Sequence, residues 1–231
     1  MALKAIDEIT KCKAKYYVIE QANPLTRYFH LDKYAYKTLI EEWHSPDRKH
    51  HFCPIDFENI FQALNITKHL EGDFVEIGTY QGSSAHAVLN YIQKTGINRK
   101  SYFLDTYEGF NYEAAQNSKD AAWYNTHTET SIEIVKEYLS KFDNFEVVKN
   151  NICEDSLPQN IEKIAVANID VDMYDAIKAA LYKVKDKIVQ HGVILVEDLG
   201  HTPWLIGAQK AYTEFMNEFG DEFIPIYGSG S

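Results

Sequence analysis

The sequence predicts an α/β protein built on a doubly wound, mostly parallel β-sheet. Five short apolar runs lie near residues 74, 102, 146, 166 and 194, and segments with the spacing of amphipathic helices separate them. This alternation is typical of parallel strands joined by helical crossovers. The 231 residues contain no internal repeat and no low-complexity tract, so we expect one main domain over residues 71–231. A helical extension over residues 1–70 would precede it.

The first 70 residues lack the alternation of β-strands. Helices are predicted over residues 3–19, over 32–43 and over 54–66. The third has apolar residues at near-helical spacing, which would pack one face onto a sheet. Residues 44–51 are polar, and they form either a solvated linker or a lid that folds over a ligand.

Residues 73–85 read as a strand, a glycine turn and a helix. Gly78 and Gly82 separate the apolar residues before them from a helical pattern that begins at Ser83. Glycine permits a sharp turn and a close approach to a ligand, and free N–H groups at the start of the helix favour an anion. The G-x-x-x-G spacing disfavours NAD, whose sites use G-x-G-x-x-G. Glu76 could instead accept bonds from an ammonium group, as on S-adenosylmethionine.

The second predicted strand, residues 101–105, ends in an acid. Asp105 lies 23 residues beyond Gly82. In a doubly wound sheet the carboxyl ends of the strands face the ligand crevice, and an acid there can accept bonds from both ribose hydroxyls of an adenosine. A polar segment over 111–128 follows, and insertions at this position commonly shape substrate sites. Its Trp123 could stack on a sugar or a base, or simply pack in the core.

The rest of the chain continues the alternation of helices and strands. We expect a helix over 129–142, strands over 145–149 and 164–170, a helix over 174–188, a strand over 192–198, a helix over 203–219 and a short strand over 223–227. The strand that starts at residue 164 ends in Asp170 and Asp172, and the strand that starts at residue 192 ends in Glu197 and Asp198.

Acidic residues at the ends of these strands would converge on one edge of the sheet. Many carboxylates close together repel one another unless cations share the space. Asp170, Glu197 and Asp198 therefore predict an oxygen-ligand site for Mg²⁺, Mn²⁺ or Ca²⁺. The alternative is that each acid caps a helix or belongs to a turn.

Composition limits the partners and the compartment. The net charge of -11 argues against a nucleic-acid partner, because such binding depends on clustered Lys and Arg. Three widely spaced cysteines indicate free thiols in a reducing compartment, and no apolar run is long enough to cross a membrane. We therefore expect a cytoplasmic protein without a membrane partner.

Four ordered motifs resemble the macrocin-type sugar O-methyltransferases, which are class I, Rossmann-like enzymes that use S-adenosylmethionine. The motifs are Glu76-x-Gly78-x-x-x-Gly82, Asp105-Thr-Tyr-Glu-Gly-Phe110, Ile169-Asp170-Val-Asp172-Met-Tyr174 and Gly192-Val-Ile-Leu-Val-Glu197-Asp198. The resemblance implies a cofactor site made of Glu76, Gly78, Tyr80, Gly82, Ser84, Asp105, Thr106 and Asn151. Asn151 would contact the adenine.

The resemblance also implies the chemistry. In this family a divalent metal binds two neighbouring sugar hydroxyls and lowers the pKa of one of them, next to the methyl group of S-adenosylmethionine. Asp170 is the first candidate for the general base, and Asp172 and His201 follow. Glu197 departs from the family's Asp, so its carboxylate reaches one methylene further.

The expected acceptor is a nucleotide-activated sugar, such as a heptose destined for capsular polysaccharide, or a glycosylated metabolite. A homodimer is expected by analogy. Two alternatives stand beside this interpretation. One is a nicotinamide-dependent sugar oxidoreductase, which would share the sheet and Asp105. The other is a non-catalytic partner protein with the same fold.

Overall fold

The structure, a computed structural model, describes residues 33–47, 49, 54–118, 120–199 and 206–225. In this part of the chain five strands form one sheet, in the order β3-β2-β1-β4-β5. The strands are β1 (Asp73–Ile77), β2 (Ser101–Asp105), β3 (Phe145–Lys149), β4 (Ile164–Ile169) and β5 (Ile188–Val196). Every neighbouring pair is parallel. The order runs outward from β1 in both directions, which confirms the doubly wound fold and puts a topological switch point between β1 and β4.

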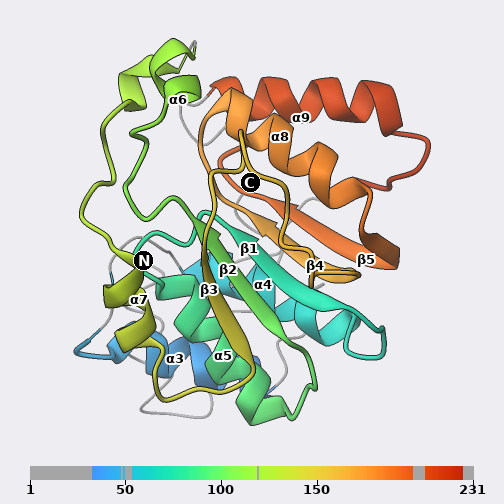
Figure 1. Cartoon of the computed structure of the whole chain (residues 1–231). Helices are drawn as coiled ribbons and strands as arrows, with labels where there is room; N and C mark the ends of the chain where they lie inside the picture. Colours follow the sequence, from blue (N-terminus) through green and yellow to red (C-terminus); the bar gives the residue numbers. More distant parts are fainter. Residues whose placement is uncertain (1–32, 48, 50–53, 119, 200–205, 226–231) are drawn as a thin grey trace, which may run out of the picture.

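Helices cover both faces of this sheet (Figure 1). On one face lie α3 (Lys33–His44), α4 (Pro54–Ile66), α5 (Ser83–Thr95) and α7 (Ile132–Tyr138), and on the other lie α8 (Tyr174–Lys185) and α9 (Ile206–Phe219). Phe74 of β1 packs in the first core and its neighbour Val75 in the second, as expected because successive side chains of a strand point to opposite faces.

The helices before the sheet share its core. Phe57 and Phe61 of α4 are buried, and the Phe61 ring stacks on Tyr91 of α5 with centroids 4.7 Å apart. A buried polar contact joins α3 to α5, where the His86 ring nitrogen Nδ1 lies 2.7 Å from Glu42 Oε2. Helices α3 and α4 thus pack as part of the sheet's own hydrophobic core. The predicted helix over 3–19 lies outside the described residues.

Two boundaries near the end of the chain differ from expectation. The apolar spacing predicted a helix as far as Ile188, but α8 ends at Lys185 and Ile188 begins β5, where it pairs with Ile164. The register then shifts, so that Val166 pairs with Val193. The position of Ile188 fits the apolar spacing of a helix and of a strand, and its pairing with Ile164 makes it part of the strand. The strand predicted over 223–227 is wrong for 223–225, which are irregular, and 226–227 lie outside the described residues.

The connection from β2 to β3 carries the predicted insertion. It contains α6 (Glu113–Asn117) and a short 3₁₀ turn, η3 (Ala121–Trp123), before α7. Two hydrogen bonds close its base: Phe110 N–H donates to Thr126 O, and Asn125 N–H donates to Phe110 O, both at 3.0 Å. In the described part of the chain, no helix is both long and apolar enough to span a bilayer.

Candidate active site

The glycine turn between β1 and α5 has a backbone that only glycine fits. Gly78 has φ of 97°, and a Cβ added there would lie 1.6 Å from the carbonyl oxygen of Asp170. Gly82 caps the start of α5 with φ of 84°. The turn therefore runs in direct backbone contact with the end of β4, at the switch point of the sheet.

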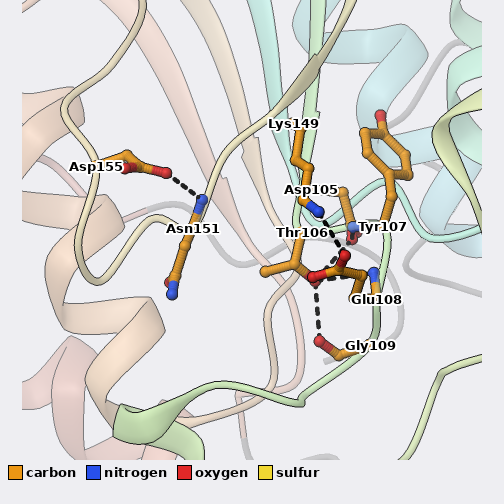
Figure 2. A network of polar contacts seen from close by, with 8 residues as sticks. All are labelled: Asp105, Thr106, Tyr107, Glu108, Gly109, Lys149, Asn151 and Asp155. Atoms are coloured by element: carbon orange, nitrogen blue, oxygen red, sulfur yellow. Dashed lines mark hydrogen bonds and ion pairs between the residues drawn. The ribbon is translucent and has the colours of Figure 1, made fainter.

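Asp105 at the end of β2, labelled in Figure 2, holds this turn in place through a hydrogen bond with the backbone of Tyr80. Its Oδ2 accepts the N–H of Tyr80 at 2.8 Å, and its Oδ1 accepts the N–H of Tyr107 at 2.6 Å. Burial raises the pKa of the carboxyl, although these N–H bonds act in the opposite direction. A carboxylate has about four lone-pair directions, and Thr106 Oγ1 also lies 3.4 Å from Oδ1, so the acceptor capacity left for a ligand is mainly on Oδ2.

The neighbouring loops are ordered by local hydrogen bonds, which Figure 2 also shows. The Thr106 hydroxyl donates to Gly109 O at 2.9 Å. After β3, Asn151 N–H donates to Asp155 Oδ2 at 2.8 Å, and the Asn151 side-chain oxygen accepts the N–H of Cys153 at 3.1 Å. The amide NH₂ of Asn151 is thus the end of that side chain left for a ligand.

Three carboxylates meet where β4 and β5 end. Asp170, Asp172 and Asp198 each offer an oxygen, and these oxygens lie within 4.8 Å of one another. Asp172 and Asp198 have φ of 53° and 64°, a left-handed conformation that Asp tolerates better than most residues. Burial raises the pKa of Asp170 and of Asp172 well above the usual range, and the charge of Asp198 raises both further.

Glu197 lies outside this group, so the predicted set Asp170, Glu197 and Asp198 differs from the group in one member, with Asp172 in its place. The charge of Glu197 still contributes to the raised pKa of Asp170, but less than the charges of Asp198 and Asp172. Burial raises the pKa of Glu197 to about 8, and the strongest charge on it is Asp56 of α4. Glu197 therefore lies under the influence of α4 as well as of the carboxylate group, since Asp198 also acts on it.

The macrocin O-methyltransferase (TylF) family matches residues 56–221, more than two thirds of the chain. The chain belongs to this family. It is therefore an O-methyltransferase that uses S-adenosylmethionine, and the nicotinamide-dependent alternative does not fit. The match spans all five strands and the three carboxylates just described.

Solved structures of methyltransferases share its fold. The O-methyltransferase NovP has a TM-score of 0.66 at 19% identity, over 75% of this chain and 76% of NovP. The calicheamicin methyltransferase CalS11 has a TM-score of 0.58 at 15% identity, over 89% of this chain and 92% of CalS11. Apo CalS11, described as a TDP-rhamnose 3'-O-methyltransferase, has a TM-score of 0.52 at 15% identity, over 89% of this chain and 94% of its own. A comparison with curated protein sequences finds no match.

In this methyltransferase one cavity joins most of the predicted site. Six of the eight predicted cofactor residues line it: Gly78, Tyr80, Ser84, Asp105, Thr106 and Asn151. The carboxylates of Asp170, Asp172 and Asp198 line it as well. Glu76, Gly82 and Glu197 are not among the lining residues. His201 lies outside the described residues.

Glu76 is buried beneath the turn. Its side chain is fully buried, and Asn168 Nδ2 donates to its Oε1 at 3.2 Å. Burial raises the pKa of Glu76 to about 7, although hydrogen bonds with Ser84 and Asn168 act in the opposite direction. An ammonium group in the cavity would therefore contact Ser84, which lines the cavity, rather than Glu76, which lies beneath it. The polar Asn168 inside an apolar run was the one sequence signal of this buried pair.

The cavity also has lining residues that the sequence analysis did not name: Lys49, from the segment predicted as a linker or a lid, and Tyr112 and His127, from the insertion predicted to shape the substrate site. Lys49 is the one lysine or arginine among the described lining residues, and its carbonyl accepts the Ser83 hydroxyl at 3.0 Å. The ring of His127 packs edge-on against Tyr80, with centroids 5.2 Å apart. Through these contacts Lys49 and the insertion lie against the glycine turn.

Proposed function

We propose that this enzyme methylates a sugar hydroxyl with the assistance of a divalent cation. One observation carries the proposal: Asp170, Asp172 and Asp198 form a compact carboxylate group in the same cavity as the glycine turn and Asp105. A cofactor at the turn and a cation at the carboxylates would share that cavity.

The lining residues fit S-adenosylmethionine. Asp105 retains acceptor capacity for ribose hydroxyls, the amide of Asn151 suits an adenine edge, and Ser84 starts a helix whose free N–H groups favour a carboxylate. S-adenosylmethionine supplies an electrophilic methyl group. The residues around it bind and orient, and this alignment is most of what methyl transfer requires.

The carboxylate group fits a hard cation such as Mg²⁺ or Mn²⁺, which prefers oxygen ligands. Burial raises the pKa of Asp170 and of Asp172, and the charge of Asp198 raises both further, so a positive charge at this place would favour the ionised carboxylates. A bound cation would supply positive charge that lowers the pKa of an acceptor hydroxyl. The residues proposed to hold it are Asp170, Asp172 and Asp198.

Asp170 is the proposed general base. It is half-buried and it lines the cavity beside the other two carboxylates, where a carboxylate oxygen could accept the proton of an acceptor hydroxyl. Asp172 has the same features and is the second candidate. His201 is the third and rests on the sequence alone.

The acceptor we propose is a nucleotide-activated sugar. Support comes from CalS11, a TDP-rhamnose 3'-O-methyltransferase that shares the fold. A heptose for capsular polysaccharide and a glycosylated metabolite are the acceptor classes to compare with it. The cytoplasmic location, the homodimer and the lid over residues 44–51 stay predictions from the sequence.

The test is incubation with methyl-labelled S-adenosylmethionine and a panel of nucleotide sugars, in EDTA and with Mg²⁺ or Mn²⁺ restored. We expect label in a sugar ether only when metal is present. Asp172→Asn should weaken Mn²⁺ binding at least tenfold, because it removes one of three charges. Asp221→Asn, an exposed surface acid, is the matched control. Full turnover in EDTA would refute the metal mechanism, and S-adenosylmethionine binding without turnover on any acceptor would favour the non-catalytic alternative.

A further inference from the structure

The tip of the insertion contacts α8 and α9, the helices that follow the carboxylate group of Asp170, Asp172 and Asp198. Asp120, between α6 and η3, is 9% exposed, and its Oδ2 accepts the N–H of Tyr174 at the start of α8 with a length of 2.9 Å. The same carboxylate lies against the start of α9, where a Cβ on Gly207 would be 1.8 Å from Oδ2. Figure 1 shows α6 at the end of the molecule where α8 and α9 begin.

We propose that Asp120 is a positioning residue that couples the acceptor-side insertion to the cation site. When Asp120 is docked, it holds the turn over residues 170–174 in the shape that brings Asp170 and Asp172 to Asp198. When it is released, the cation site loosens. This inference rests on the proposed metal-assisted function, and it assigns a role to a residue that lies outside the carboxylate group.

The turn itself shows why an outside anchor is needed. Its first end is fixed because Asp170 N–H donates to Ile77 O of β1 at 2.8 Å. In its middle, Asp172 has φ of 53°, a conformation that persists only where the surroundings enforce it. At its far end the first N–H groups of α8 lack partners within the helix, and the cap residue Met173 provides no side-chain bond. Asp120 supplies that bond from another part of the chain.

The carboxylate of Asp120 also suits the place electrostatically. Two helices of 12 and 14 residues begin beside it, and the N-terminal end of a helix carries partial positive charge. The closeness of Gly207 leaves no room for a side chain between them. An anion seated in this way is held in one position.

The other end of the insertion reaches the cavity. Phe110, Tyr112 and His127 line the cavity, and the hydrogen bonds between Phe110 and residues 125–126 close the insertion's base. One segment thus contributes to the cavity wall with its base and fastens the turn at residues 170–174 with its tip. A movement of the wall would be transmitted to the carboxylates through Asp120.

The test measures Mn²⁺ binding by electron paramagnetic resonance and S-adenosylhomocysteine binding by calorimetry, on the full-length chain without acceptor. Asp120→Ala should weaken Mn²⁺ at least fivefold, about 1 kcal/mol at roughly 1.4 kcal/mol per tenfold, and leave S-adenosylhomocysteine within twofold. Asp120→Asn keeps an acceptor oxygen, so it should lose less Mn²⁺ affinity than Asp120→Ala. Glu113→Gln, an exposed acid of the same insertion, is the matched control and should change nothing.

Gly207→Ala approaches the same contact from the other side. Alanine is the better helix former, yet its Cβ would displace Asp120, so this variant should lose Mn²⁺ affinity as Asp120→Ala does. The double variant should be no worse than Asp120→Ala alone, because both changes break one contact. Melting curves establish whether each variant is folded. If Asp120→Ala does not fold, the Mn²⁺ affinities of Asp120→Asn and Gly207→Ala provide the test.

The possible outcomes distinguish a failure of this inference from a failure of the proposed metal-assisted function on which it rests. Wild-type protein that binds no Mn²⁺ would overturn the metal-assisted function, and the inference with it. Wild-type protein that binds Mn²⁺ while Asp120→Ala and Gly207→Ala bind it equally well would overturn the inference alone. Equal losses of Mn²⁺ and S-adenosylhomocysteine in folded Asp120→Ala would show a general loosening of the domain, which also contradicts it.

Discussion

Glu197 gives the sharpest test of how the site is built, because the sequence assigned it to the metal and the structure leaves it outside the carboxylate group. Its pKa is raised from 4.5 to about 8, first by burial and then by Asp56. Between those pH values the folded chain holds a proton that the unfolded chain has lost. The free energy of unfolding of the metal-free protein should therefore fall as pH rises through this range.

The size of the effect follows from the shift. One proton changes the free energy of unfolding by up to about 1.4 kcal/mol per pH unit, so the fall from pH 5 to pH 8 has an upper limit of about 4 kcal/mol. For a chain of this length that corresponds to a melting temperature roughly 8 to 16 °C lower. Glu197→Gln has no charge to bury, so it should flatten this slope.

The assay is thermal unfolding of metal-free protein at pH 5, 6, 7 and 8, with Mn²⁺ affinity measured at pH 7.5. Wild type should lose stability steadily toward pH 8, and Glu197→Gln should melt above it at that pH. Glu222→Gln, an exposed glutamate near the end of α9, is the matched control and should keep the wild-type slope. Mn²⁺ affinity of Glu197→Gln should stay within about threefold of wild type, since one tenfold step is about 1.4 kcal/mol.

Two results would refute this reasoning. A parallel pH slope in Glu197→Gln would mean that Glu197 is ionised in the folded protein at neutral pH. A loss of Mn²⁺ affinity by tenfold or more would mean that Glu197 is a ligand after all, and that a bound cation draws it into the carboxylate group.

Three further predictions follow from the cavity. Asp105→Ala should weaken S-adenosylhomocysteine roughly ten- to hundredfold by calorimetry while Mn²⁺ affinity stays unchanged; equal affinity for the cofactor product would remove Asp105 from the site. Glu76→Gln should bind S-adenosylhomocysteine like wild type and melt higher at pH 8, because its charged form is disfavoured by burial; a large loss of affinity would restore it as the ammonium acceptor. Gly78→Ala should melt at least about 6 °C lower, since its Cβ would collide with Asp170 O and cost roughly 3 kcal/mol; an unchanged melting temperature would contradict the close backbone contact.

The sequence predicted the sheet and the turn because their signals are local. Apolar runs gave all five strands, and Gly78 and Gly82 marked a backbone that needs positive φ. Asp105 was predictable in the same way, because strand ends in a doubly wound sheet face the crevice. These features depend on residues close to one another along the chain.

What the sequence missed depends on tertiary contacts. Ile188 suits a helix or a strand, and only its pairing with Ile164 decides. Whether Asp172 or Glu197 joins Asp170 depends on how the chain turns after β4 and after β5, and the positive φ values of Asp172 and Asp198 have no local sequence signal. Asp120 bonds to a residue 54 positions away, so no local pattern could indicate its role.

The closed base of the insertion has a practical consequence for engineering. Phe110 is hydrogen-bonded to Asn125 and Thr126, so the two ends of the segment lie next to each other. Residues 111–124 can therefore be exchanged as a cassette for segments from related enzymes without rerouting the sheet, provided that an aspartate takes the place of Asp120. Libraries of such cassettes would vary acceptor choice on a constant methyl-transfer scaffold.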